Sequence, residues 1–331
     1  MHPLRSPYAP EGAKKICVLS DALWQDFTPA PFLKNYAWEM HYIQKATAIA
    51  QVTELAQQDF DVFLNLCDGA SDEDRPGLEV VQTLERLRVP FTGADTTFYE
   101  PTREMMKHVC HTLGLGAPGG LYAFTPADVD RAAQELRFPL IVKHPSSYNS
   151  IGLTPASRVE TVEQLHAQAQ TMFAHFGEAL IEEFIDGREF TVLVVENPHD
   201  PTHPFAYAPV EFRFPAGETF KHYDMKMINY RQMDIVPCPD LGLAEKLMEM
   251  SKKVFVGLNG VSYGRCDIRV NAEGEPFLLE INPNCALFYP EEYGSADLII
   301  LNDPDGYAGF LERIFDAALA RCAARISNPV R

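Results

Sequence analysis

Residues 263–284, YGRCDIRVNAEGEPFLLEINPN, contain the pattern on which the fold of this chain depends. Two strand-like runs are separated by Asn-Ala-Glu-Gly, a sequence typical of a β-hairpin turn. Arg265 and Asp267 lie two residues apart in the first run, and Glu280 and Asn282 have the same spacing in the second. Because side chains two apart on a strand share a face, we expect these four groups to meet over one surface of a sheet.

The residue types of this hairpin suit a site for metal and phosphate. Asp267, Glu280 and Asn282 offer oxygen ligands of the kind that Mg²⁺ prefers when it also holds phosphate oxygens. Arg265 would then have an electrostatic role, in which its guanidinium stabilises negative charge beside the metal. The solvated outer face of an ordinary hairpin shows the same alternation of charged and apolar residues, so spacing alone leaves both interpretations open.

A second feature lies upstream, where the apolar run PLIVK ends at Lys143. A short polar loop follows it and contains Ser147, Asn149, Ser150 and Gly152. A lysine before such a loop can hold one phosphate while the N–H groups and hydroxyls of the loop surround another. The loop is not a P-loop, because GxxxxGK[ST] is missing. The alternative is a surface lysine followed by a flexible loop.

The third feature is the segment LIEEFIDGREFTV, residues 180–192, which joins two apolar runs. A short extended linker can offer its backbone N–H and C=O groups to a flat heterocycle. Glu189, further along the segment, can accept a ribose hydroxyl. An isolated hairpin without a ligand would have the same appearance.

Length and composition exclude several classes of protein. The chain has 331 residues, of which 46% are hydrophobic, enough for two or three lobes with cores of their own. Its 7 cysteines show no CxxC spacing, which argues against a disulfide framework and a structural zinc site. The net charge of −18 gives no long-range attraction to nucleic acid or to anionic membranes. With neither a membrane-spanning run nor the apolar core of a signal peptide, we expect a cytoplasmic protein.

Hydrophobic periodicity predicts an alternation of strands and helices along the chain. The first strands expected are 15–20 and 60–66, with a helix near 43–57 between them, which predicts a parallel α/β lobe. The later strands expected are 139–143, 178–185, 189–195 and 206–212, with a loop around 220–233. The later helices expected are 102–113, 126–136, 161–176, 243–258 and 307–326.

Taken together, the lysine strand, the loop after it, IEEFIDGREFTV, YGRCDIRV and FLLEINPN follow an order that resembles the ATP-grasp ligases, most closely the D-alanine–D-alanine ligase branch. The resemblance covers about residues 62–315, and it is specific as a set although no single piece is. It implies an α/β fold with an N-terminal domain over 1–98, of which 1–11 form a flexible tail. A central lid subdomain over 99–182 and a C-terminal catalytic subdomain over 183–331 would clasp ATP.

The resemblance also implies a site residue by residue, with ATP and two Mg²⁺ ions, for which Mn²⁺ can substitute, between the second and third lobes. The residues implied to bind the nucleotide are Arg103, Lys143, Ser147, Asn149, Ser150, Gly152, Glu182, Glu183, Phe184, Ile185, Glu189 and Lys226. The residues implied to hold the metal are Asp267, Glu280 and Asn282. The residues implied to be catalytic are Arg265, Lys226 and Ser150.

The implied activity is the joining of a carboxylate to an amine. The carboxylate would attack the γ-phosphate of ATP to give an acyl phosphate, which the amine then attacks, releasing ADP and phosphate. Both partners would be small molecules, with no nucleic acid or membrane involved, and the resemblance is compatible with a homodimer. The substrate carboxylate and the triphosphate are both anions and must approach each other. The triphosphate would therefore be neutralised by the metal together with Lys143, Lys226 and Arg103.

The sequence departs from the D-alanine ligase pattern where substrates are chosen. Residues 19–31 read LSDALWQDFTPAP in place of the family's Gly-Gly loop and its glutamate. The segment after Asn282, which contains Ala286, lacks the Pro-Gly pair that relatives generally have there. Glu183 occupies a position where relatives commonly have a lysine that contacts the adenine. We therefore expect an amino acid to be joined to another amino acid or to a non-standard carboxylate. True D-alanine–D-alanine ligation and a non-catalytic nucleotide-binding regulator are the alternatives.

Overall fold

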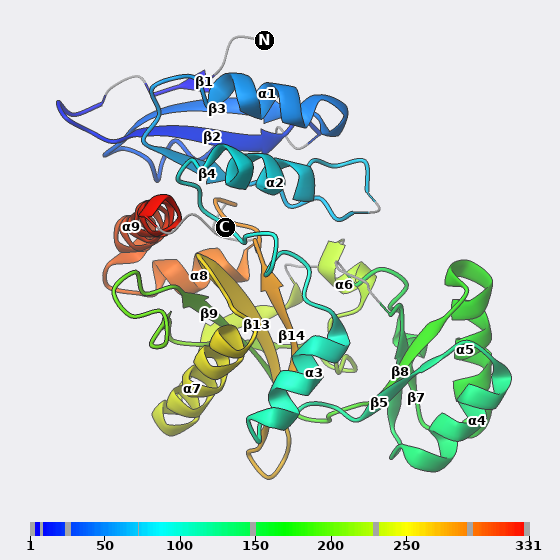
Figure 1. Cartoon of the computed structure of the whole chain (residues 1–331). Helices are drawn as coiled ribbons and strands as arrows, with labels where there is room; N and C mark the ends of the chain where they lie inside the picture. Colours follow the sequence, from blue (N-terminus) through cyan, green and yellow to red (C-terminus); the bar gives the residue numbers. More distant parts are fainter. Residues whose placement is uncertain are drawn as a thin grey trace.

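The computed structural model of the chain contains three β-sheets with helices packed against them (Figure 1). The residues that it describes are 4–6, 9–23, 28–71, 73–145, 150–227, 232–289 and 294–327. The side chains of residues 226 and 227 lie outside this description. Within these ranges, no helix has the length and apolar character that crossing a membrane requires.

The first sheet has the strand order β1-β3-β2-β4. Its elements are β1 (Leu4–Arg5), β2 (Lys15–Asp21), β3 (Ala37–Ile43), η1 (Lys45–Thr47), α1 (Ala48–Leu55), β4 (Val62–Asn65) and α2 (Leu78–Leu87). Because β2 is parallel to both β3 and β4, the predicted parallel α/β lobe is confirmed. The sequence did not predict β3, whose Trp38 and Met40 face the core. Leu4 pairs with Met40, so the expectation of a flexible tail over 1–11 is wrong at β1.

The second sheet forms the central lobe and has the order β5-β8-β6-β7. Its elements are β5 (Gly120–Ala123), α4 (Pro126–Glu135), β6 (Leu140–Lys143), η2 (Pro155–Ser157), β7 (Arg158–Val159), α5 (Val162–Phe176) and β8 (Ala179–Glu183). Both helices begin where the sequence predicts, since the Thr125 side chain accepts from the N–H of Asp128 and that of Thr161 from the N–H of Gln164. The helices pack on the sheet and give the lobe a core of its own.

The third sheet has the order β12-β11-β9-β13-β14, with β10 beside β9. Its strands are β9 (Arg188–Val195), β10 (Phe205–Ala206), β11 (Val210–Arg213), β12 (Asp234–Pro237), β13 (Tyr263–Val270) and β14 (Pro276–Pro283). The helices beside it are α3 (Arg103–Thr112), α6 (Tyr223–Met227), α7 (Leu241–Gly257), α8 (Ser295–Leu301) and α9 (Gly306–Ser327). The predicted hairpin and long helices are thus confirmed as β13–β14, α3, α7 and α9. The short α6 interrupts the region expected to be a loop.

The two faces of the third sheet are covered by different helices. Val192 of β9 belongs to the core beneath α7, whereas Leu193 packs into the core beneath α8 and α9. Tyr263, at the start of β13, lies in the second of these cores. Arg265 and Asp267 follow Tyr263 at two-residue steps and share its face. The charged part of this face therefore begins where the apolar cover from α8 and α9 ends.

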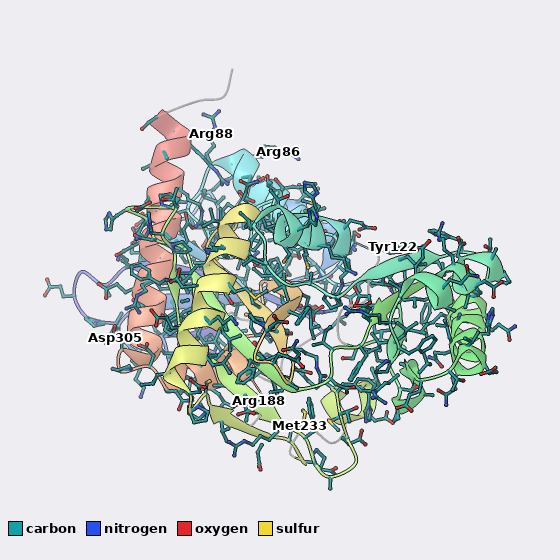
Figure 2. The ribbon with its side chains drawn as sticks, turned by 90° about the horizontal axis from the view of Figure 1, so that it is seen from below. Arg86, Arg88, Tyr122, Arg188, Met233 and Asp305 are labelled. Carbon is teal, nitrogen blue, oxygen red and sulfur yellow. The ribbon has the colours of Figure 1, made fainter. Side chains whose placement is uncertain are left out.

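Helix α3 packs on α7 and β14, and its Met106 and Cys110 are buried in the core beneath α7. It therefore belongs with the third sheet rather than with the lobe over 99–182 in which it was expected. The first lobe lies over the third sheet, and the central lobe lies to one side (Figure 1). Tyr122 of β5 lies where the central lobe meets the rest of the molecule (Figure 2). The β13–β14 hairpin is thus close to all three lobes.

Candidate active site

The hairpin brings the four predicted side chains together. Arg265 lies opposite Asn282, and Asp267 lies opposite Glu280. Arg265 donates from Nε and Nη2 to the Asp267 carboxylate at 3.1 and 3.0 Å. The Asn282 amide donates to Asp267 at 3.2 Å and to Glu280 at 3.3 Å. The predicted convergence is therefore confirmed as geometry, while the role of each residue stays a prediction.

The charges of this cluster favour ionised side chains. Burial opposes ionisation of Asp267, yet Arg265 and then Lys221 hold the pKa of this carboxyl below its ordinary range. Glu280 accepts from Arg103, which also donates to the carbonyl of Leu279 at 2.9 Å. Two carboxylates and one amide oxygen are hard ligands that suit Mg²⁺. This cluster has two carboxylates and an asparagine; among the described residues, no group of three or more His, Cys, Asp or Glu side chains could hold a metal.

Lys143 ends β6 and points to a carboxylate on the neighbouring strand. Its ammonium pairs with Glu182 of β8, which is 3% exposed. Lys107 of α3 reaches the other oxygen of Glu182 at 2.6 Å. Burial opposes ionisation of Glu182, but Lys143, Lys107 and Arg103 lower its pKa to about 2. The Glu182 side chain, expected in the adenine connector, is thus the counter-ion of two lysines.

One cavity of about 110 Å³ joins the central and third lobes. Predicted residues of both lobes line it: Arg103, Lys143, Ser150, Glu182, Glu183, Phe184, Ile185, Glu189, Asp267 and Glu280. Lys143 and the hairpin carboxylates therefore face a common space, as a site for a metal-bound nucleotide requires. Arg265 and Asn282 are not among the residues that line this cavity, but both contact Asp267, which does line it.

Two backbone N–H groups at the end of β8 and just after it already donate hydrogen bonds within the protein. The N–H of Glu183 donates to the carbonyl of Gly119 at 2.8 Å, and the N–H of Phe184 donates to that of Pro139 at 2.9 Å. The Glu183 carboxylate accepts from Arg137 at 3.0 Å. These two N–H groups are therefore not available to an adenine in this cavity.

Other predicted residues lie near or beyond the limits of the description. Ser147 and Asn149 fall outside the described residues, as does the side chain of Lys226 in α6. Ser150 donates from Oγ to the carbonyl of Lys221 at 3.4 Å. Gly152 has φ +74°, a conformation that glycine adopts without strain.

Sequence reasoning missed three cations of this site, which are Lys107, Lys221 and Arg269. Lys107 lies four residues after Arg103, so helical spacing could have placed both on one face. Arg269 continues the two-residue alternation of the β13 face, a signal that was present in the sequence. Lys221 lies in an irregular segment, where no periodic signal marks it.

A second cavity lies beyond Arg265, where β2 and β4 of the first lobe end. Its walls are Ser20, Asp21, Leu66, Asp68, Arg75, Tyr263, Asn284, Cys285, Ala286, Leu287 and Tyr289. Arg75 donates to Asp21 at 2.8 Å and also pairs with Asp68 and Glu73. Burial raises the pKa of Asp68, against the effect of Arg75. Ligands of α/β sheets bind at such carboxyl ends of strands, so this cavity is a candidate substrate site.

Two lobes that place a lysine and a carboxylate cluster around one cavity are the arrangement expected of the ATP-grasp fold. Solved structures support this fold over most of the chain. The D-alanine–D-alanine ligase of Bacillus anthracis complexed with ATP covers 95% of this chain and 99% of its own, with a TM-score of 0.67 and 19% identity. The D-Ala:D-Ser ligase of Enterococcus faecalis covers 92% and 99%, with a TM-score of 0.68 and 15% identity.

Sequence comparison identifies the family. The family model described as D-ala D-ala ligase C-terminus matches residues 124–287. The D-alanine–D-alanine ligase of Mannheimia succiniciproducens is 30% identical over 263 residues, 76% of this chain and 78% of that protein. That of Ectopseudomonas mendocina is 32% identical over 220 residues, 65% of this chain and 64% of that protein, so the match spans less than two thirds of this relative. The chain belongs to the D-alanine–D-alanine ligase family.

Proposed function

We propose that this protein is an ATP-dependent ligase that joins a carboxylate to an amine through an acyl phosphate and releases ADP and phosphate. The observation that carries the proposal is the shared cavity. Lys143 from the central lobe and the carboxylates of Asp267 and Glu280 from the third lobe line it together. Membership of the D-alanine–D-alanine ligase family supports the same activity.

The chemistry follows from the charges of the cavity. Asp267, Glu280 and Asn282 would hold magnesium, for which manganese can substitute. When bound, the metal supplies positive charge to the phosphate oxygens. Lys143 and Arg103 add cations, without which an anionic carboxylate could not approach the triphosphate. Negative charge then develops on the carbonyl oxygen as the amine attacks, and the guanidinium of Arg265 can stabilise it.

The acid substrate is best accommodated by the second cavity, one two-residue step beyond Arg265 along β13. Its charged side chains are Asp21, Asp68 and Arg75, so the walls carry a net negative charge. Such walls favour an acid that also bears an ammonium group, which is an amino acid. We infer that an amino acid is joined to another amino acid or to a non-standard carboxylate. The family's name favours D-alanine as both partners, which is the second candidate.

The test is a screen for ADP release with amino acids and carboxylates supplied in pairs, followed by mass measurement of the products. D-alanine alone should give a dipeptide only if the second candidate is correct. Replacement of Glu280 by Ala should abolish ADP release, whereas Glu273→Ala, on the exposed turn of the same hairpin, should not. ADP release that survives in Glu280→Ala would contradict the proposed site. A wild type that binds ATP without turnover with any pair would favour a regulator.

We further propose that the protein acts in the cytoplasm on small molecules. ATP is abundant there, and the reaction consumes it. The net charge of −18 disfavours an encounter with nucleic acid or an anionic membrane surface. Fractionation of cells that express the protein tests the location.

A further inference from the structure

Lys221 lies in the nucleotide cavity and is held by a carboxylate there. Its side chain is 15% exposed, and it is part of the cavity wall. The ammonium is 3.2 Å from Oε1 of Glu189 and 3.6 Å from the centre of the Phe212 ring. This is the end of the cavity at which Glu189 is expected to meet the ribose.

Glu189 has a second cation on its other oxygen. Nη1 of Arg269 is 3.3 Å from Oε2 of Glu189, and the Arg269 side chain is 3% exposed. Nη2 of Arg269 donates to the carbonyls of Gly187 and Thr219, each at 2.9 Å. Arg269 is therefore fixed by several protein oxygens, while Lys221 has a flexible stem beside the cavity. Since one cation suffices to neutralise one carboxylate, Lys221 is the partner that can leave.

The partner of Lys221, Glu189, lies in the sheet close to a second carboxylate, that of Asp267. Glu189 lies opposite Arg269, and Asp267 is two residues before Arg269 in β13. Side chains in this diagonal relation on neighbouring strands lie about 7–8 Å apart. The charge of Lys221 also contributes, after burial and Arg265, to the pKa of Asp267. A triphosphate that runs from a ribose at Glu189 to a metal at Asp267 must therefore pass Lys221.

The segment that carries Lys221 is joined to the loop expected to cover the phosphates. Ser150 donates from Oγ to the carbonyl of Lys221 at 3.4 Å. The N–H of Tyr223 donates to the carbonyl of Leu153 at 3.0 Å. A movement of residues 150–153 toward the nucleotide would therefore be transmitted to the backbone of Lys221.

We propose that Lys221 exchanges Glu189 for phosphate oxygens of the bound nucleotide, which frees Oε1 of Glu189 to accept a ribose hydroxyl. The lysine is thus a phosphate-binding residue in addition to Lys143 and Arg103. This inference rests on the proposed function, because it takes ATP as the nucleotide. The exchange is favourable, because the triphosphate carries more negative charge than one carboxylate and Arg269 still neutralises Glu189.

The test is a calorimetric titration of adenosine, ADP and ATP, each with Mg²⁺, into the wild type, Lys221→Met and Lys221→Arg. We expect Lys221→Met to weaken ATP binding about 10-fold or more, ADP binding by less and adenosine binding not at all. Lys221→Arg should recover most of the loss, because it restores the charge. Lys246→Met is the matched control, since this exposed lysine donates to the carbonyl of Gly274 at 2.9 Å, away from the cavity.

Equal weakening of adenosine, ADP and ATP would overturn the inference, because Lys221 would then act only as a fixed partner of Glu189. Unchanged affinity for all three would overturn it as well. Circular dichroism checks the folding of each variant, and Lys221→Gln replaces Lys221→Met if the latter does not fold. A wild type that binds no adenine nucleotide would instead refute the proposed function, so the two failures are distinguishable.

Discussion

Replacing Glu182 by Gln should destabilise the protein by about 3 kcal/mol at neutral pH. Glu182 is 3% exposed and pairs with Lys143 and Lys107. These cations lower its pKa from 4.5 to about 2. At about 1.4 kcal/mol per pKa unit, the carboxylate contributes about 3 kcal/mol of stability. Removing one member of a buried ion pair typically costs about 3–5 kcal/mol, which agrees with this magnitude.

The assay is urea unfolding at pH 7, followed by far-ultraviolet circular dichroism. The matched control is Glu183→Gln on the same strand, whose partner Arg137 is 86% exposed. A solvent-exposed pair of this kind contributes at most about 1 kcal/mol. Because the pKa of Glu182 is lowered on folding, its contribution is fully present above pH 4.5 and is lost as the pH falls toward 2. A loss in Glu182→Gln no larger than that in Glu183→Gln at pH 7 would refute the reasoning.

Two further predictions concern Arg265 and a buried acid. Arg265→Lys should lower kcat about 100-fold or more while MgATP still binds, because lysine cannot reproduce the two-point contact with Asp267. The assay is steady-state ADP release, and an unchanged kcat would exclude a role for Arg265 in the reaction. Burial raises the pKa of Asp297 from 3.8 to about 6, so its stabilising effect is full below pH 3.8 and lost as the pH rises through 6. Relative to Asp297→Asn, the wild type should gain about 1 kcal/mol of unfolding free energy between pH 7 and pH 5, and parallel pH profiles of the two proteins would contradict this assignment.

The hairpin cluster could be predicted because local rules determine it. A turn sequence fixes which residues oppose each other, and the two-residue period of a strand fixes which side chains share a face. Arg265 and Asp267 therefore met Glu280 and Asn282 as expected. The capped helices of the central lobe were predictable for the same reason, since Thr125 and Thr161 act within their own first turns.

The partners of the cavity cations could not be predicted in this way. Glu182 meets Lys107 and Lys143 only after α3 has packed against the third sheet and β6 has paired with β8. Such contacts depend on tertiary arrangement rather than on sequence period. The strand β3 was missed because its own sequence, AWEMHYI, mixes polar and apolar residues and gives no apolar run.

The position of α3 affects how the central and third lobes can move relative to each other. Arg103 and Lys107 lie one turn apart, and each holds a carboxylate of a different lobe, Glu280 in the third and Glu182 in the central lobe. Helix α3 packs on α7 and β14 of the third lobe, and the ion pair between Lys107 and Glu182 connects it to the central lobe. The central lobe therefore cannot move away from α3 as a rigid body without breaking the ion pair between Lys107 and Glu182. Through this ion pair, α3 opposes an opening of the cavity between the two lobes.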